Sequence, residues 1–517
     1  MHVAQDNNYM KLSLSLASEV TPLMSVAANV IHYDIPFLWL LFLQKPRVVV
    51  IGGSFSGLAT IRRLRRHVDI ILIEPKDYFE YTPGVLHLLA GSNVFDALIV
   101  PMSEVALGVD HIRGFFEAVK PDKKVAFIRS IDGITLTQIR YDVLVICTGR
   151  PYMQPIRPSI CNLEIQSRSD DIREFYNKLR IADKVLVLGG GLVGVEMAAE
   201  IAYRYRCKNF PKVTLISSSE LLQTLPKKAG IFAHSWLRKM GVEILLQDSL
   251  SSSNREPIVF TSKTKACTNL HTLKGKIIKD VELIVDCSNN RTSPLWNLYD
   301  SLRIGKPGSS KLPDDIIDDN QVVTWPYNDA GFVEVNEYLQ TTWDDRIFAA
   351  GDVTELTFKS GSGTTDSGLS GKGAGKFTIR NAFLAESQAA LVATNIKKTL
   401  NAKISNRISS SLIMTKYPSG IFHGTKKAPL VACVSLGPSN GILIFNDFVF
   451  GGIIIGAFIG FLKFIIERTK VAEIKHHKWG RAIWIFGHTF VNVVHFFSDK
   501  IKGLFHEENL MFGKLCS

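Results

Sequence analysis

One stretch near the start of the chain constrains the fold more than any other. Residues 48–51 form a continuous apolar run, which is typical of a strand buried on both faces. The turn Gly52-Gly53-Ser54-Phe55-Ser56-Gly57 follows at once, then an amphipathic segment, then the apolar run 70–73, which ends on Glu74. The order of strand, glycine turn, helix, strand and acid predicts a dinucleotide-binding βαβ unit.

Each part of this unit has a physical role. Gly52 allows a sharp turn, and Gly57 lets the helix pack closely on the sheet, while the start of the helix offers backbone N–H groups to a pyrophosphate. Glu74 lies 22 residues after Gly52, where a carboxylate accepts a hydrogen bond from a ribose hydroxyl. Ser54 replaces the second glycine of the motif but is small. The alternative is an ordinary βαβ unit with a small-residue turn, which the terminal acid makes less favourable.

A second unit of the same kind begins about 137 residues later. The strand 184–188 leads into a complete G-x-G-x-x-G motif formed by Gly189, Gly191 and Gly194, and a helix and the strand 213–216 follow. That strand ends on three serines rather than on an acid. The missing carboxylate removes the usual repulsion of a 2′-phosphate, yet no arginine stands beside it to bind one. NADH and NADPH therefore both stay open.

Two further apolar runs end in residues that suit a cofactor. The strand 141–147 is followed by Thr148-Gly149, which allows a close approach of the backbone. The strand 346–350 is followed by Gly351-Asp352, which places a carboxylate where it can meet the ribityl chain of a flavin. The alternative for Asp352 is a helix N-cap, because aspartate is a good capping residue.

These patterns predict an α/β fold with more than one domain. We expect two Rossmann-like domains and a C-terminal α+β region. The segment 1–44 is apolar, and we interpret it either as a membrane-contacting extension or as the result of a poorly chosen start site. The predicted boundaries are 1–44 for this extension, 45–165 and 291–400 for the FAD domain, 166–290 for the NAD(P)H domain and 401–517 for a membrane-associating region.

Some connecting segments have local signatures. We predict a hairpin excursion at 249–276, a loop at 305–320, a low-complexity Gly/Ser/Thr stretch at 359–376 and a helix at 377–400. The seven cysteines are scattered and none has C-x-x-C spacing, which favours a reducing compartment. No metal site is predicted.

The C-terminal region combines apolar, basic and aromatic residues. Residues 448–462 carry no charge, are interrupted by glycines and are short for a simple membrane span. From 463 to 502 there are eight Lys/Arg against three Asp/Glu, interleaved with aromatic residues. This pattern favours a membrane-dipping element followed by an interfacial helix on anionic lipid. The alternatives are a buried strand and helix, and a solvated basic face over an aromatic core.

Together these motifs resemble the flavoproteins with two dinucleotide-binding domains, over roughly residues 47–400. Within that superfamily the chain is most similar to apoptosis-inducing-factor-like proteins of the ferroptosis-suppressor type, and type II NADH dehydrogenases are more distant. The stretches that carry this likeness are 194–201, 331–340 and 434–441. The resemblance implies an NAD(P)H domain inserted into the FAD domain, with FAD on the first unit and NAD(P)H on the second. It also implies reduction of a quinone at a membrane surface. Ser288-Asn289 departs from the Thr-Gly of many relatives, and the apolar termini leave the mode of membrane attachment open.

The resemblance also implies roles for three residues. Glu196, just after the third glycine of the second motif, is expected near the nicotinamide, where it positions the ring or relays protons. Its alternative role is that of a first-turn helix acid favoured by the dipole. Arg380 matches the family position of a basic residue that stabilises negative charge on the reduced flavin. Lys376 is the second candidate for that role, and a solvated cation at the start of a helix is the alternative.

The cysteine pattern narrows the range of possible electron acceptors. Disulfide reductases of this fold need a cysteine pair close to the flavin, and none occurs between residues 74 and 129. A small diffusible acceptor such as a quinone is therefore expected, on a mitochondrial, lipid-droplet or other cytoplasmic-face membrane inside the cell.

Two alternative functions stay open. One is a flavoprotein whose redox state controls partner binding, and the other is a reductase of a soluble protein such as a ferredoxin. The net charge of +12 permits nucleic-acid binding, but the basic residues are dispersed and no such module is present, so no nucleic-acid partner is expected. The oligomeric state is left open.

Overall fold

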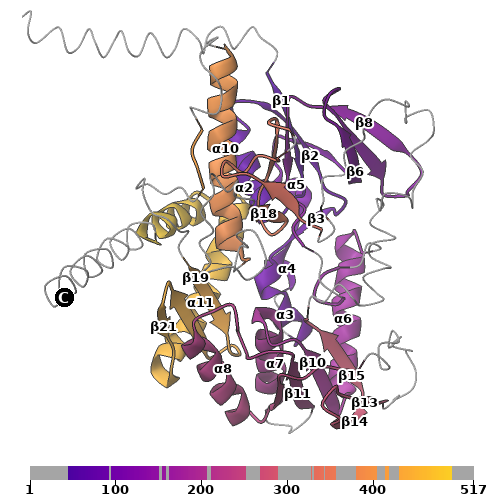
Figure 1. The fold of residues 1–517 in the computed structure, drawn as a ribbon, viewed down its shortest axis with the longest axis vertical. Coiled ribbons are helices and arrows are strands. Elements are labelled where there is room, and N and C mark those ends of the chain that lie inside the picture. The colour runs from indigo at the N-terminus through magenta and orange to yellow at the C-terminus, as the bar shows by residue number, and fades with distance from the viewer. Residues whose placement is uncertain are drawn as a thin grey trace, which may run out of the picture.

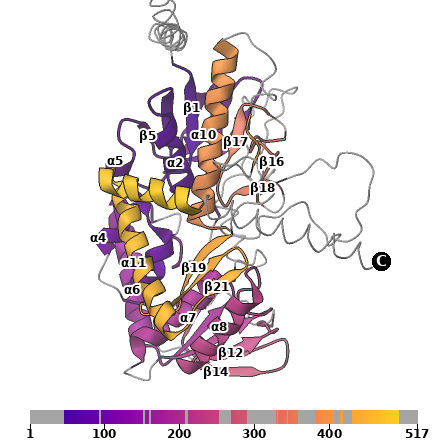
Figure 2. The same ribbon diagram turned by 90° about the vertical axis from the view of Figure 1, so that its left-hand side faces the viewer.

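A computed structural model of the chain describes residues 45–491 except 92–94, 151–153, 159–161, 207–210, 252–267, 289–327, 329–330, 343, 357–379, 405–413 and 418–429. The expectations for the extension 1–44, for the segments 305–320 and 359–376, and for Lys376 therefore lie outside the described residues. Two α/β lobes follow one another along the long axis of the molecule, and the C-terminal elements pack along both (Figures 1 and 2).

The first lobe is built on a five-stranded parallel sheet in the order β17-β9-β1-β2-β5. Its strands are β1 (Arg47–Ile51), β2 (Asp69–Ile73), β5 (Asp110–Ile112), β9 (Val143–Ile146) and β17 (Ile347–Ala349). The predicted strand at residues 48–51 is buried and pairs in parallel on both sides, with β2 and with β9. The last strand, β17, comes from about 200 residues further along the chain than β9, so the chain returns to this sheet after building the second lobe.

The second lobe has a four-stranded parallel sheet in the order β12-β11-β10-β15. Its strands are β10 (Lys184–Leu188), β11 (Lys212–Ser217), β12 (Glu243–Leu246) and β15 (Leu283–Asp286). As in the first lobe, the strand that leads into a glycine motif lies inside the sheet, with a parallel neighbour on each side. The two sheets confirm the predicted α/β fold class.

Smaller sheets surround these two. A three-stranded antiparallel sheet consists of β6 (Gly114–Lys120), β7 (Val125–Ser130) and β8 (Leu136–Arg140). Strands β13 (Thr268–His271) and β14 (Ile277–Val281) form an antiparallel hairpin at the end of the predicted excursion. Two further pairs are β3 (Tyr78–Glu80) with β4 (Ile99–Pro101) and β16 (Val333–Val335) with β18 (Thr354–Leu356). The C-terminal sheet contains β19 (Val431–Ser435), β20 (Gly441–Phe445) and β21 (Phe448–Phe450).

The helices cover the sheets and connect the lobes. They are α2 (Phe55–Leu64), α3 (Val85–Leu89), α4 (Phe95–Leu98), α5 (Met102–Val105), α6 (Ile165–Ile181), α7 (Leu192–Tyr205), α8 (Lys227–Lys239), α10 (Ala382–Ile404) and α11 (Ile453–Ile474), and a short 3₁₀ turn spans Thr82–Gly84. Helix α10 lies beside α2 in the first lobe (Figure 1).

Two details of the sequence expectations are corrected. The late helix begins at Ala382 rather than before Arg380, because the Asn381 side chain accepts the Leu384 backbone N–H at 2.9 Å and so caps the helix. Residues 377–379 lie outside the described part of the chain. Asp352 does not cap a helix, since the strand β18 follows it.

The apolar segment 448–462 forms β21 and the first half of α11, and a further helix covers 478–491. No helix among the described residues is long and apolar enough to cross a membrane. The basic C-terminal surface is smaller than the sequence pattern indicates. Lys470 is buried and Lys463 is largely buried, and each is held in an ion pair.

A charged cluster fixes these C-terminal helices to the first lobe. Lys470 of α11 pairs with Glu386 of α10 and with Glu473, and Arg62 of α2 contacts the same two carboxylates at 3.4 and 3.3 Å. His488 stacks on Phe383 with 4.7 Å between ring centres. Figure 2 shows the helix after α11 crossing towards the lower end of α10. The C-terminal region is therefore part of the core assembly.

Candidate functional site

The first glycine turn is held by contacts that exclude side chains. Gly52 follows β1 with φ +102°, and a Cβ there lies 2.5 Å from the carbonyl oxygen of Cys147. A Cβ at Gly57 lies 1.9 Å from the Gly52 carbonyl oxygen, so α2 touches the turn directly. Both positions need glycine for packing alone.

The start of α2 is prepared for an anion. Its N-cap residue, Ser54, makes no side-chain capping bond, and the first turn holds no acid. Ser54, Phe55 and Ser56 line a cavity of about 450 Å³ in front of the helix. Backbone N–H groups and the positive end of the helix dipole favour a phosphate at such a position.

Glu74 connects the end of β2 to this turn. Its side chain is buried, and its Oε2 accepts the Gly53 backbone N–H at 2.7 Å. Its Oε1 accepts the Lys76 backbone N–H at 3.1 Å, and both residues line the cavity. The predicted ribose acid therefore also fixes the glycine turn to the sheet.

We expect Glu74→Ala to release the cofactor of the first unit. The change leaves the buried Gly53 N–H without its carboxylate, and a hydrogen bond to a charged group contributes roughly 1.5–3 kcal/mol. The flavin-to-protein ratio after gel filtration should fall at least about tenfold at limiting flavin. Asp69→Ala, at the exposed start of the same strand, is the matched control. Full flavin retention by Glu74→Ala contradicts the assignment.

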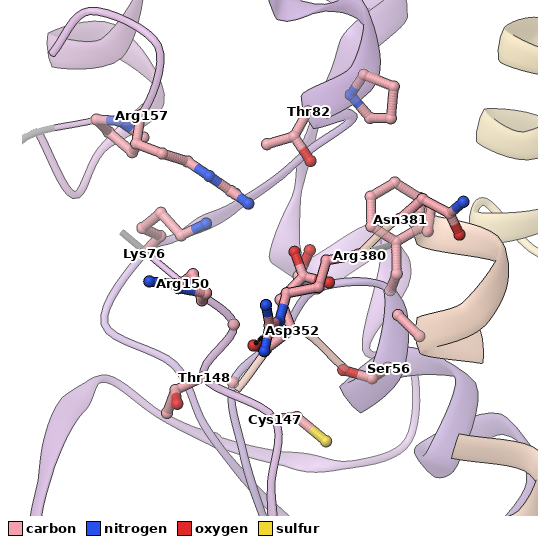
Figure 3. Close-up of a pocket in the computed structure, with 18 of the residues that line it drawn as sticks. Ser56, Lys76, Thr82, Cys147, Thr148, Arg150, Arg157, Asp352, Arg380 and Asn381 are labelled. Atoms are coloured by element: carbon pink, nitrogen blue, oxygen red, sulfur yellow. Dashed lines mark hydrogen bonds between the residues drawn. The ribbon is translucent and has the colours of Figure 1, made fainter. Parts of the chain in front are cut away.

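The ends of β9 and β17 bring more predicted residues to the same cavity. Thr148, Gly149 and Asp352 all line it, whereas Gly351 lies behind it with φ +90°. Burial raises the pKa of the Asp352 carboxyl, and the positive charges of Arg157, Arg380 and Arg150 oppose that rise. Figure 3 shows these side chains around the cavity.

Arginines make one wall of the cavity strongly basic. The Arg380 Nε donates to the Asp352 carbonyl oxygen at 3.1 Å. The guanidinium groups of Arg380 and Arg150 lie 4.4 and 4.5 Å from the centre of the Phe332 ring. Arg380 thus lines the cavity of the first unit beside Asp352. Lys76, Arg150 and Arg157 also line it, but they carry no motif of their own and were not predicted from the sequence.

The second glycine motif repeats the packing of the first. Gly189 has φ +103°, and a Cβ at Gly194 lies 1.8 Å from the Gly189 carbonyl oxygen. A Cβ at Gly191 meets nothing within 4 Å, so this glycine leaves open space in front of α7. These three glycines do not line the 450 Å³ cavity, but Leu192 and Glu196 in the next turns do. The first turns of α7 therefore form part of the wall of the cavity that lies in front of the first glycine motif.

The Glu196 carboxylate connects α7 to β19 and α11 at the cavity wall. Its Oε1 accepts both the Lys463 ammonium and the Ser435 backbone N–H at 2.7 Å. Burial alone lowers the pKa of Lys463, but the Glu196 carboxylate raises it above its ordinary value. Both side chains line the cavity, so Glu196 is more than a dipole-favoured helix acid.

From the sequence pattern, Lys463 counts among the surface cations, because it is the first charge after the uncharged run 448–462. Its position beside Glu196 follows from the packing of α11 against α7 and β19, and lysine is largely buried only where it is paired in this way.

The residues present fit a flavin nucleotide. Parallel strands end at a cavity within the usual range of 300–1,000 Å³ for ligand sites. The cavity has a helix N-terminus, a buried acid after the second strand and a basic wall. A second parallel sheet with its own glycine turn adjoins it. This fold and site define a two-domain dinucleotide-binding oxidoreductase.

Comparison with known proteins shows which family and which individual proteins the chain resembles. The profile of the pyridine nucleotide-disulphide oxidoreductases matches residues 46–285, and over this stretch the chain resembles this family, a resemblance that implies FAD and NAD(P)H as cofactors. Apoptosis-inducing factor homolog A of Dictyostelium discoideum is 22% identical over 78% of this chain and 86% of its own. Ferroptosis suppressor protein 1 of Taeniopygia guttata is 27% identical over 60% of this chain and 74% of its own.

Solved structures agree on the fold. The sulfide:quinone oxidoreductase of Aquifex aeolicus matches with a TM-score of 0.56 and 18% identity, over 84% of this chain and 92% of its own. NDH2 of Plasmodium falciparum in complex with NADH matches with a TM-score of 0.55 and 14% identity, over 82% of this chain and 98% of its own. The predicted likeness to apoptosis-inducing-factor-type flavoproteins is confirmed at this distance.

Proposed function

We propose that this chain is an NAD(P)H:quinone oxidoreductase that works on a membrane surface. The observation that carries the proposal is the two-sided character of α11. Its inner side places Lys463 in the cavity beside Glu196. Its outer side exposes large apolar residues, among them Ile454, Phe458 and Phe461. One helix is thus both a wall of the redox cavity and an apolar ridge.

These exposed apolar residues indicate a surface that a membrane or a partner covers. Phe458 and Phe461 are 64% and 59% exposed, and Phe486 and Phe490 on the following helix are 72% and 59% exposed. Contiguous apolar patches of this kind mark interaction sites. Exposed basic residues, Lys478 and Arg481 among them, accompany the ridge and favour an anionic lipid surface. A lipid-soluble acceptor could then reach the cavity without crossing water. The proposed location is a mitochondrial, lipid-droplet or other cytoplasmic-face membrane.

The described cysteines do not provide another route for electrons. Cys147, Cys287 and Cys433 are free thiols, and burial raises the pKa of Cys147 to about 12 and that of Cys433 to about 11. A buried neutral thiol is a poor nucleophile. Among the described residues, the cavity therefore offers no thiolate to carry a disulfide reaction, which supports a diffusible acceptor.

The proposed roles follow from the contacts. The α2 N-terminus and Glu74 bind the nucleotide of the first unit, and Asp352 with Arg380 orients it. When bound, FAD accepts a hydride from NAD(P)H and passes two electrons to the acceptor. Lys463 and Glu196 hold a proton at the cavity wall, where a reduced acceptor oxygen needs one.

Replacing Phe458 and Phe461 by serine should weaken membrane binding without affecting the redox reaction itself. Burial of one such side chain contributes roughly 1.5–3 kcal/mol, so binding to vesicles of phosphatidylcholine with phosphatidylserine should weaken at least about tenfold. Oxidation of NADH by vesicle-embedded ubiquinone should fall with it, while oxidation by a water-soluble short-chain quinone stays.

The matched control for this experiment is Ile134→Ser, an equally exposed apolar residue on the turn between β7 and β8. It should behave as the wild type with both acceptors. Unchanged vesicle binding by the double phenylalanine variant contradicts the proposed membrane surface. Failure of the wild type to oxidise NADH with either quinone contradicts the proposed acceptor.

A further inference from the structure

Reduction of a quinone needs a proton that NAD(P)H does not supply. One NAD(P)H, one proton and one quinone give NAD(P)⁺ and one quinol. The hydride carries two electrons and the first proton, and the second proton comes from water. In the proposed function the acceptor is reduced in the cavity whose wall includes Lys463 and Glu196, both largely buried. A path for protons into this wall is therefore part of the reaction.

A chain of polar contacts leads from this wall towards the surface. Glu196 and Glu200 lie one turn apart on α7, and Ser435 of β19 contacts both. The Ser435 backbone N–H donates to Glu196 at 2.7 Å, and its hydroxyl oxygen lies 3.4 Å from Glu200 Oε1 and 3.3 Å from the Gly437 carbonyl oxygen. Glu200 in turn lies 2.9 Å from the His87 Nδ1.

The ends of this chain differ in exposure, as a proton path requires. The Glu200 side chain is only 1% exposed, whereas that of His87 is 17% exposed and reaches solvent at the edge of α3. The second carboxylate oxygen of Glu200 is buried and has no hydrogen-bond partner among the described residues. A buried carboxylate with an unused oxygen needs an explanation, and a role in proton transfer is one.

We propose that His87 and Glu200 are the proton entry of this enzyme, with Ser435 holding Glu200 and Glu196 in place one helical turn apart. This inference rests on the proposed quinone reduction. The Lys463 N–H bond breaks as an O–H bond forms on the reduced quinone oxygen. The His87 imidazolium then gives its proton to the Glu200 carboxylate, and the proton crosses the turn of α7 through a bridging water to the Glu196–Lys463 pair. The neutral Lys463 amine takes it up, and Glu200 is again a carboxylate. His87 then takes a proton from water.

The other charged groups around His87 do not offer an equal path. Glu467 of α11 lies within electrostatic range of His87, Glu200, Lys463 and Arg468. Burial raises the pKa of the Glu467 carboxyl, while the charges of His87, Lys463 and Arg468 lower it. Glu467 therefore contributes charge beside the path, and Glu467→Gln serves as the matched control.

The test compares two acceptors on the NADH-reduced protein in a stopped-flow instrument. Ubiquinone needs the extra proton, whereas ferricyanide takes electrons only. Glu200→Gln and His87→Ala should slow reoxidation by a short-chain ubiquinone about 10- to 100-fold and leave reoxidation by ferricyanide unchanged. Ser435→Ala keeps the backbone N–H to Glu196 and removes the hydroxyl contact with Glu200, so it should slow the quinone step alone. Glu467→Gln should match the wild type.

Two further readouts separate proton transfer from a structural role. Added imidazole should restore the quinone rate of His87→Ala, because the site is open to solvent. In nitrogen-15 spectra of the full-length protein with labelled histidine, the His87 Nδ1 proton should appear as a hydrogen-bonded signal that Glu200→Gln removes.

Three outcomes overturn the inference. Wild-type quinone rates in Glu200→Gln and His87→Ala refute it and leave the proposed function intact. Equal slowing with both acceptors, without rescue by imidazole, assigns these residues a structural role and also refutes it. A wild-type protein that ferricyanide reoxidises and quinone does not refutes the proposed function, and the proton entry falls with it.

Discussion

Replacing Gly194 by alanine should abolish reduction of the protein by NAD(P)H while the flavin stays bound. A Cβ at this position lies 1.8 Å from the Gly189 carbonyl oxygen, a distance that no real contact allows. Helix α7 must then move away from the turn at the end of β10, and with it the N–H groups that bind the pyrophosphate. We expect the rate of flavin bleaching by NADH to fall at least about a hundredfold, as expected when a binding geometry is displaced.

Two glycine variants act as controls for this result. Gly57→Ala introduces the equivalent overlap, 1.9 Å from the Gly52 carbonyl oxygen, in the other lobe, and should cost the protein its flavin instead. Gly191→Ala has open space around its Cβ, so it should leave the melting temperature unchanged and weaken only NAD(P)H binding. Rapid bleaching of Gly194→Ala contradicts the assignment of the second motif to the nicotinamide nucleotide.

The second large effect is expected at the buried ion pair of the cavity wall. Lys463→Met leaves the Glu196 carboxylate buried without its cation, and breaking such a pair costs roughly 3–5 kcal/mol. The free energy of unfolding should fall by about this amount in urea denaturation. Reoxidation of the reduced protein by quinone should slow as well, because the proton donor of the wall is gone.

The double variant Glu196→Gln with Lys463→Met separates these two effects. With both charges removed, no unpaired ion stays in the interior, so much of the lost stability should return. The quinone step should stay slow. Full recovery of that step in the double variant contradicts a role of the pair in proton transfer, and an unchanged stability of Lys463→Met contradicts its burial.

The parts of the site that are local in sequence could be predicted. Gly52 and Gly57, and Gly189 and Gly194, lie within six residues of each other, and their role follows from the backbone geometry of one turn. Glu74 follows in the next strand, at a spacing fixed by one helix. Such patterns predict both the parallel sheets and the cavity edge, because each βαβ unit determines its own geometry.

Contacts between distant segments could not be predicted in this way. Lys463 meets Glu196 across 267 residues, and Arg62 meets Glu386 across 324. A basic residue in an apolar helix indicates an interfacial position when only composition is considered, and here tertiary packing turns it inward. The arginines at 150 and 157 likewise reach the cavity because they follow strand β9, which lies inside the sheet between β17 and β1.

The most direct test of the central claim is anaerobic reduction of the purified protein by NADH, followed at the flavin absorbance band, with a short-chain ubiquinone added afterwards. Rapid bleaching and rapid recovery of the band are the predicted result. Bleaching without recovery contradicts quinone as the acceptor, and a purified protein without flavin absorbance contradicts the enzyme assignment itself.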